Sequence, residues 1–130
     1  MGASMSNYEN SHEFLYKKTS QNEILEFQSN EQWKAHFNAC KETNKLMVID
    51  FTATWCGPCK FMEPTIKEFA NRYSEVEFVK IDVDKFTEVA AEFGVEAMPT
   101  FILVKRGKEV DRLVGAKKDD LQSKIEKHKI

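Results

Sequence analysis

The sequence has no excess of charge of one sign and no long run of apolar residues. Its 130 residues include 19 lysines and arginines against 21 acidic residues, for a formal net charge of -2. A basic patch or stripe is the usual sign of a nucleic-acid-binding protein, so we expect no nucleic-acid partner. The longest apolar stretches, such as LMVIDF and FILV, are strand-sized and far short of the roughly 20 residues that cross a bilayer. The composition is therefore typical of one ordinary domain without a transmembrane segment.

Cysteine is also scarce, with only Cys40, Cys56 and Cys59. This number is too small, and odd, for a secreted scaffold stapled by disulfides. The segment 1–20 lacks the apolar core of a secretory signal, so we expect a cytoplasmic protein. In a reducing compartment a Cys-x-x-Cys pair is more often catalytic or metal-binding than structural. The role of Cys56 and Cys59 thus decides the function.

The pattern of apolar residues divides the chain near residue 24. Residues 1–23 are polar and show no sustained periodicity, which predicts a flexible extension, and residues 24–130 form the domain. Strands are predicted at residues 24–28, 46–51, 76–84, 100–106 and 109–115, and helices at residues 30–43, 57–73, 85–93 and 117–130. The order β-α-β-α-β-α-β-β-α predicts an α/β domain with a central five-stranded mixed sheet flanked by four helices.

Capping residues mark two of the helix starts. Ser29 and Gln32 fit a capping box, in which both side chains satisfy free N–H groups at the start of a helix. Asp84 stands before the helix at 85–93, which Gly94 is expected to end, and it is predicted to cap that helix.

One interpretation of Cys56 and Cys59 is a zinc site, since Cys-x-x-Cys begins many of them. Zinc takes four protein ligands, or three and a water, and usually draws on a second ligand pair. The other side chains that could serve are Cys40, His12, His36 and His128. They form no second pair, so we predict no metal site. We expect Cys40 to be a small buried hydrophobe on the apolar face of its helix, and His36 and His128 to lie at the surface.

A redox function makes different demands, and the residues meet them. The thiolate is the reactive form of cysteine, and a helix N-terminus lowers a thiol pKa because its free N–H groups favour the anion. Cys56 stands at the start of a predicted helix, and Cys59 lies one turn further on the same face, near enough to close a disulfide. The pair can therefore open and close while the fold stays intact.

Five short stretches of the sequence belong together: WCGPC at residues 55–59, VIDF with Asp50, VKIDVD with Lys80, AMPTF at residues 97–101 and VGA at residues 114–116. Taken together, they resemble the thioredoxin family. Their order and spacing match the family over about residues 24–130, and the stretch that leads to the cysteines is most similar to the plant cytosolic h-type. The resemblance implies the thioredoxin fold and a thiol-disulfide oxidoreductase that reduces protein disulfides and holds no cofactor.

The resemblance also implies the partners of the protein. They would be disulfide-containing target proteins and an NADPH-dependent thioredoxin reductase that restores the dithiol, in the service of electron transport and cell redox homeostasis. We expect a monomer. A second class of function is a binding module, in which the same surface holds a partner and the redox chemistry is incidental.

The resemblance also implies a role for individual residues of the site. Cys56 would attack the target disulfide, and Cys59 would resolve the mixed disulfide. Asp50 is an acid inside an apolar strand, so burial should raise its pKa and let it take the proton of Cys59. The alternative is a buried acid that pairs with Lys80 for structure, and Lys80 is the expected partner of Asp50 in both cases. Gly57 and Pro58 would tune the redox potential.

A flat apolar surface beside the dithiol would receive the substrate. Pro99 corresponds to a cis-proline of the family, which would leave the backbone of Met98 free to pair with an extended segment. The surface would consist of Trp55, Gly57, Pro58, Met98, Pro99, Gly115 and Ala116. For Trp55 the alternative is packing in the core, and Gly115 could equally be an ordinary turn glycine.

The first residues, MGASMS, fit a pattern for N-myristoylation, with Gly2 exposed once Met1 is removed. A cloning remnant before an original start at Met5 explains the same residues equally well. One acyl chain anchors a protein only marginally, so attachment to a membrane through Gly2 would be reversible.

Overall fold

The computed structural model of the protein describes residues 24–130. The predicted extension at residues 1–23, including Gly2 and His12, lies outside the described residues. The elements are α2 (Asn30–Cys40), β1 (Met47–Thr52), α3 (Gly57–Arg72), β2 (Glu77–Asp82), α4 (Thr87–Glu92), β3 (Thr100–Lys105), β4 (Lys108–Val114) and α5 (Lys118–His128). Within this part of the chain no helix combines the length and the apolar character that a membrane span requires.

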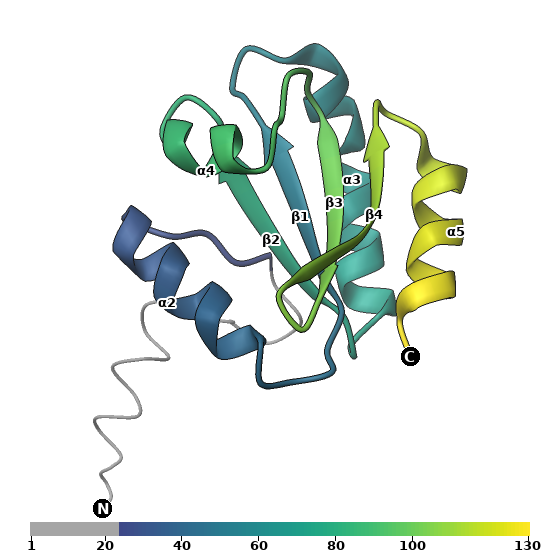
Figure 1. Cartoon of the computed structure of the whole chain (residues 1–130). Coiled ribbons are helices and arrows are strands. Elements are labelled where there is room, and N and C mark those ends of the chain that lie inside the picture. Colours follow the sequence, from purple (N-terminus) through teal and green to yellow (C-terminus); the bar gives the residue numbers. More distant parts are fainter. Residues whose placement is uncertain (1–23) are drawn as a thin grey trace, which may run out of the picture.

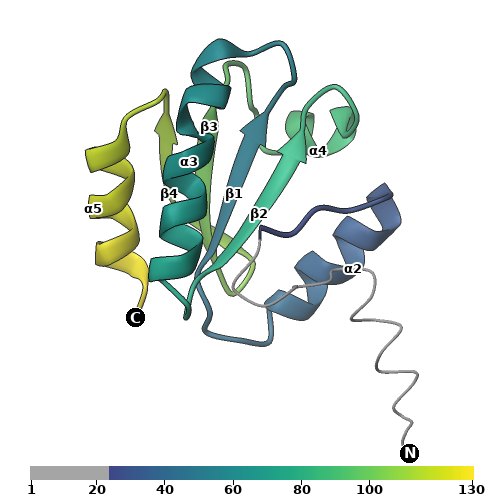
Figure 2. The same ribbon diagram turned by 180° about the vertical axis from the view of Figure 1, so that it is seen from behind.

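The strands form one mixed sheet with the order β2-β1-β3-β4, and helices cover both of its faces (Figure 1). From behind, α3 and α5 lie over one face, whereas α2 and α4 lie over the other (Figure 2). The predicted fold class is confirmed, although the sheet has four strands rather than five. In the segment 24–28 only Leu25 pairs, in a parallel bridge to Val79, because the chain turns away to begin α2 after Ser29.

The central strand β1 explains how the two cores form. Successive side chains of a strand point to opposite faces, so a run that is apolar at every position is buried on both sides. Val48 lies in the core under α3 and α5, while Ile49 and Phe51 lie in the core under α2 and α4. By the same alternation Asp50 faces the α3 side of the sheet, and it is the register partner of Lys80 on β2.

The two predicted helix caps have different outcomes. Ser29 caps α2 as predicted, since its Oγ accepts from Gln32 N at 3.1 Å. The return bond of the predicted capping box is displaced by one residue, because Gln32 Oε1 accepts from the backbone N–H of Gln28 at 2.7 Å and not from that of Ser29. The predicted cap by Asp84 is wrong, because α4 begins at Thr87 and no side chain caps it. Asp84 lies too early in the chain, and its carboxylate accepts a hydrogen bond from Trp55 instead.

Candidate active site

The ends of four strands meet at one edge of the sheet, and the predicted site residues lie there (Figure 1). β1 and β2 run parallel, whereas β3 runs antiparallel to both β1 and β4. The carboxyl ends of β1, β2 and β4 therefore meet the start of β3. The cysteines follow β1, Met98 and Pro99 precede β3, and Gly115 follows β4. Functional sites of open α/β sheets form at the carboxyl ends of parallel strands.

Cys56 and Cys59 form a disulfide at the start of α3, with their Cα atoms 5.3 Å apart. Cys56 is the N-cap residue, and the backbone N–H of Cys59 donates to Cys56 Sγ at 3.1 Å. Both cysteines are buried and pack with Ala53. Pro58 in the first turn lacks an N–H that would have no helical partner in any case. When the disulfide opens, the Cys59 N–H and the helix dipole favour Cys56 as the thiolate.

Trp55 stands out from the surface beside the dithiol, with 67% of its area exposed. The alternative that it packs in the core is therefore wrong. Its indole Nε1 donates to Asp84 Oδ2 at 2.9 Å, so the loop after β2 fixes the orientation of the ring. Gly57 and Pro58 are also exposed, and together with Trp55 they form an apolar surface next to Cys56.

Asp50 lies at the α3 side of β1 with one carboxylate oxygen, Oδ1, shielded from solvent and without a hydrogen-bond partner in the described part of the chain. Burial raises the pKa of Asp50 to about 7. The positive charge of Lys80 opposes this rise in the Asp50 pKa, whereas the negative charge of Glu63 on α3 adds to it. A carboxyl group with such a pKa can accept or release a proton near neutral pH.

The loop before β3 brings the backbone of Met98 against the cysteines. A cis peptide bond joins Met98 to Pro99, as the resemblance implied. The carbonyl oxygen of Met98 lies 3.7 Å from Cys56 Sγ, and the N–H of Gly115 donates to the carbonyl oxygen of Pro99 at 2.8 Å. Pro99 itself is buried, so the accessible part of this surface comes from the half-buried Met98, Gly115 and Ala116.

Gly115 is a turn residue that lies beside Pro99, and its part in substrate binding stays a prediction. Its φ is 111°, a backbone conformation that favours glycine, so it serves as a turn residue after β4. Its bond to Pro99 also places it at the predicted substrate surface.

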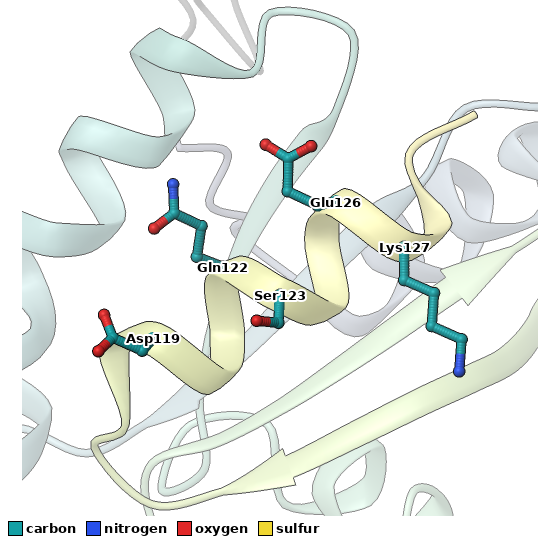
Figure 3. A pocket seen from close by; sticks show the side chains of 5 residues that line it. All are labelled: Asp119, Gln122, Ser123, Glu126 and Lys127. Carbon is teal, nitrogen blue, oxygen red and sulfur yellow. The ribbon is translucent and has the colours of Figure 1, made fainter.

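A hollow on the outer side of α5 is separate from this site (Figure 3). Its lining consists of Asp119, Gln122, Ser123, Glu126 and Lys127. Glu126 and Gln122 bind the hydroxyl of Tyr73, which ties α5 to the end of α3. None of the predicted site residues lines this hollow, and two of its five lining residues, Gln122 and Glu126, serve the contact with Tyr73.

Two residues that act on the site were not predicted from the sequence. Glu63 follows Cys59 by four residues, one helical turn, and this spacing could have indicated its place near Asp50. Asp84 was assigned to a helix cap, and no local pattern indicates its bond with Trp55 across 29 residues of sequence.

Comparison with known proteins agrees with this geometry. The Thioredoxin family model matches residues 25–127. Thioredoxin H2 of Arabidopsis thaliana is 56% identical over 104 residues, which cover 80% of this chain and 78% of that protein. Thioredoxin H7 of the same plant is 47% identical over the full length of both chains. The crystal structure of thioredoxin NaTrxh from Nicotiana alata superposes with a TM-score of 0.83 and 55% identity, covering 88% of this chain and 99% of that one. The chain therefore belongs to the thioredoxin family, and the prediction of similarity to plant h-type thioredoxins is confirmed.

Proposed function

We propose that the protein reduces disulfides in target proteins by opening and closing the Cys56–Cys59 pair. As a thioredoxin with this disulfide, it is a thiol-disulfide oxidoreductase. One observation carries the proposal most directly: Cys56 lies at the N-cap of α3 with the Met98 carbonyl oxygen 3.7 Å from its sulfur. The reactive sulfur and the backbone that can receive a substrate are thus side by side.

The reaction would proceed in two exchanges. The Cys56 thiolate attacks one sulfur of the target disulfide, the target S–S bond breaks, and one target thiolate leaves. The Cys59 thiolate then attacks Cys56 Sγ and releases the second target thiolate. The target gains two electrons, and the protein ends with the Cys56–Cys59 disulfide.

Asp50 would serve the second exchange as a proton acceptor. Cys59 must lose its proton before it attacks, and a carboxyl group with a pKa of about 7 can take a proton at neutral pH. The shielded oxygen of Asp50 has no other hydrogen-bond partner in the described part of the chain, so it is available for this transfer. Lys80 would be a positioning residue that sets the pKa of Asp50 through its charge.

The substrate would dock as an extended segment on the surface formed by Trp55, Gly57, Pro58, Met98, Gly115 and Ala116. Backbone groups of Met98 would pair with the backbone of that segment, as in strand addition. A flat apolar surface that reads backbone gives little side-chain specificity, which suits a reductase with many targets. Gly57 and Pro58 would also tune the redox potential.

We propose an NADPH-dependent thioredoxin reductase as the electron donor. The full-length protein should reduce insulin disulfides with either dithiothreitol or NADPH and this reductase. Cys56→Ser should abolish this activity, whereas Cys40→Ser should retain it. Activity with dithiothreitol but none with the reductase would overturn the donor alone, and unchanged turnover of Cys56→Ser would overturn the mechanism.

The cytoplasm and a monomeric state are our proposals for location and assembly, with reversible membrane attachment if Gly2 is acylated. Sedimentation of the oxidised protein tests the monomer, since a dimer would contradict it. Mass spectrometry of the protein from its native cells tests Gly2, because a free N-terminus there would exclude the lipid. Fractionation of the same cells tests the location, and recovery mainly from an organelle would contradict it.

A further inference from the structure

His36, Cys40 and Glu77 bring three ligand atoms of different kinds together outside the active site. His36 Nε2 lies 2.8 Å from Glu77 Oε1, and Cys40 Sγ lies 3.6 Å from His36 Nε2 and 3.4 Å from Glu77 Oε1. His36 and Cys40 are four residues apart on one face of α2, and Glu77 is the first residue of β2. An imidazole, a thiol and a carboxylate are the three side-chain groups that bind zinc in proteins.

This cluster differs from what the sequence predicted. Cys40 was expected to be a buried hydrophobe, but it is half-buried and its thiol donates to Glu77 Oε1. His36 was expected at the surface, but only 13% of its side chain is exposed. Only the fold brings Glu77 to this cluster, because it is separated from both residues by 37 or more positions in the sequence.

The cluster is independent of the dithiol. Glu77 lies at the amino end of β2, whereas the cysteine pair lies at the edge where β1 and β2 have their carboxyl ends. A strand of six residues separates the two edges by about 16 Å, at roughly 3.3 Å per residue. The cluster also keeps its ligand atoms when Cys56 and Cys59 are oxidised, because Cys40 is a free cysteine in that state.

We propose that His36, Cys40 and Glu77 bind one divalent transition-metal ion of the zinc class, with a water molecule as the fourth ligand. Bonds of about 2.0–2.3 Å at tetrahedral angles separate neighbouring ligand atoms by about 3.3–3.6 Å. The two separations that involve Cys40 Sγ, 3.4 and 3.6 Å, already fall in this range. The third, from His36 Nε2 to Glu77 Oε1, is 2.8 Å and would lengthen by about 0.5 Å as the ion replaces their hydrogen bond.

The surroundings of the cluster suit a bound cation. All three residues are partly buried, which strengthens charge interactions between them and a bound cation. The ring of Phe27 packs against His36 with a centroid distance of 5.2 Å and limits its movement. A bound ion would tie the end of α2 to the start of β2 by three bonds.

Metal binding would release the thiol proton of Cys40. Without metal, burial and then the negative charge of Glu77 raise the pKa of Cys40 to about 12. A divalent cation stabilises the thiolate directly and neutralises the carboxylate that opposes it. Lys45, the other charged group that acts on both Cys40 and Glu77, lowers their pKa values.

The test is a titration of the oxidised full-length protein with Co²⁺ and Zn²⁺, since oxidation removes Cys56 and Cys59 as ligands. We expect one equivalent of Co²⁺ to produce a thiolate-to-cobalt charge-transfer band in the near ultraviolet. Cys40→Ser should lose this band. Zn²⁺ binding should weaken by more than about tenfold in each of the three single variants, Cys40→Ser, His36→Gln and Glu77→Gln. The matched control is His128→Gln, which removes a histidine that pairs with Asp111 at 2.9 Å without a thiol nearby. This control should bind Zn²⁺ as the wild type does.

A second measurement needs no variant. Zn²⁺ should slow the alkylation of Cys40 in the oxidised wild-type protein, because the metal occupies its sulfur, and Mg²⁺ should not. Insulin reduction by Cys40→Ser should be unchanged, which separates this site from the proposed reductase function. The proposal is overturned if the wild type shows no charge-transfer band, if Cys40→Ser binds Zn²⁺ as tightly as the wild type, or if Zn²⁺ leaves the alkylation rate of Cys40 unchanged.

Discussion

Asp50 of β1 and Lys80 of β2 are register partners in the sheet, yet Asp50 Oδ1 accepts no hydrogen bond from Lys80 or from any other group between residues 24 and 130. Lys80 acts on Asp50 only as a nearby charge, and burial dominates the pKa of the carboxyl group. The pKa of Asp50 therefore stays raised, whereas a tight ion pair with Lys80 would have lowered it. This relationship makes Asp50 available as a proton acceptor, and several consequences can be measured.

The Asp50→Asn substitution should slow the release of target from the mixed disulfide by about 100-fold, because a general base contributes factors of this order. The step should be followed from a preformed mixed disulfide, in which Cys56 cannot titrate. The wild-type rate should rise with pH and level off above about pH 7, where Asp50 is ionised. If Asp50→Asn released the target at the wild-type rate and with the wild-type pH profile, Asp50 would be excluded as the proton acceptor.

The same substitution should change how stability depends on pH. The pKa of Asp50 is about 7 in the folded protein and 3.8 as the unperturbed value, so between these values the folded state holds the proton more tightly. The contribution of protonated Asp50 to the stability of the fold is therefore fully present below about pH 4, and it is lost as pH rises through about 7. At about 1.4 kcal/mol per pKa unit, the loss amounts to at most about 4 kcal/mol. Urea unfolding of the oxidised proteins should show that Asp50→Asn raises the free energy of unfolding more at pH 8 than at pH 4.5, relative to the wild type. The same change in this free energy with pH in the two proteins would contradict the prediction.

Two further variants should move the pKa of Asp50 in opposite directions. Lys80→Met removes a charge that lowers the pKa, and Glu63→Gln removes a charge that raises it. The midpoint of the resolution rate should therefore move to higher pH in Lys80→Met and to lower pH in Glu63→Gln. The pH dependence of the second exchange measures both, and a shift of both midpoints in one direction would contradict the electrostatic account.

Trp55 should matter for substrate and hardly for stability. It is 67% exposed, so Trp55→Ala should change the free energy of unfolding by only about 0.5 kcal/mol and raise the KM for insulin. Trp33 is the matched control, since it is 2% exposed and its replacement by Ala should cost about 3–5 kcal/mol. Equal losses of stability in the two variants would mean that Trp55 is a structural residue.

Much of the active site could be predicted because its signals are local or come with the family resemblance. The spacing of Cys56 and Cys59 at a helix start follows from the sequence, and so does an acid inside an apolar strand at position 50. The cis bond before Pro99 leaves no trace in composition or periodicity, and only the resemblance implied it.

The residues that sequence reasoning missed are joined by tertiary contacts. Asp84 looked like a helix cap because Asp often stands there, but the fold uses its carboxylate for Trp55. Glu77 begins a strand with no motif around it, and only the packing of α2 against β2 brings it to His36 and Cys40. Residues 24–28 have the alternation of a strand, but the cap at Ser29 ends the pairing after one bridge.

The central claim is that Cys56 attacks the target and Cys59 releases it. The most direct measurement is peptide mapping of the covalent complex that Cys59→Ser forms with a disulfide-containing protein, with Cys56→Ser treated in parallel. The account predicts a mixed disulfide through Cys56 in the first variant and no complex in the second. A complex through Cys40, or no complex with Cys59→Ser, would contradict it.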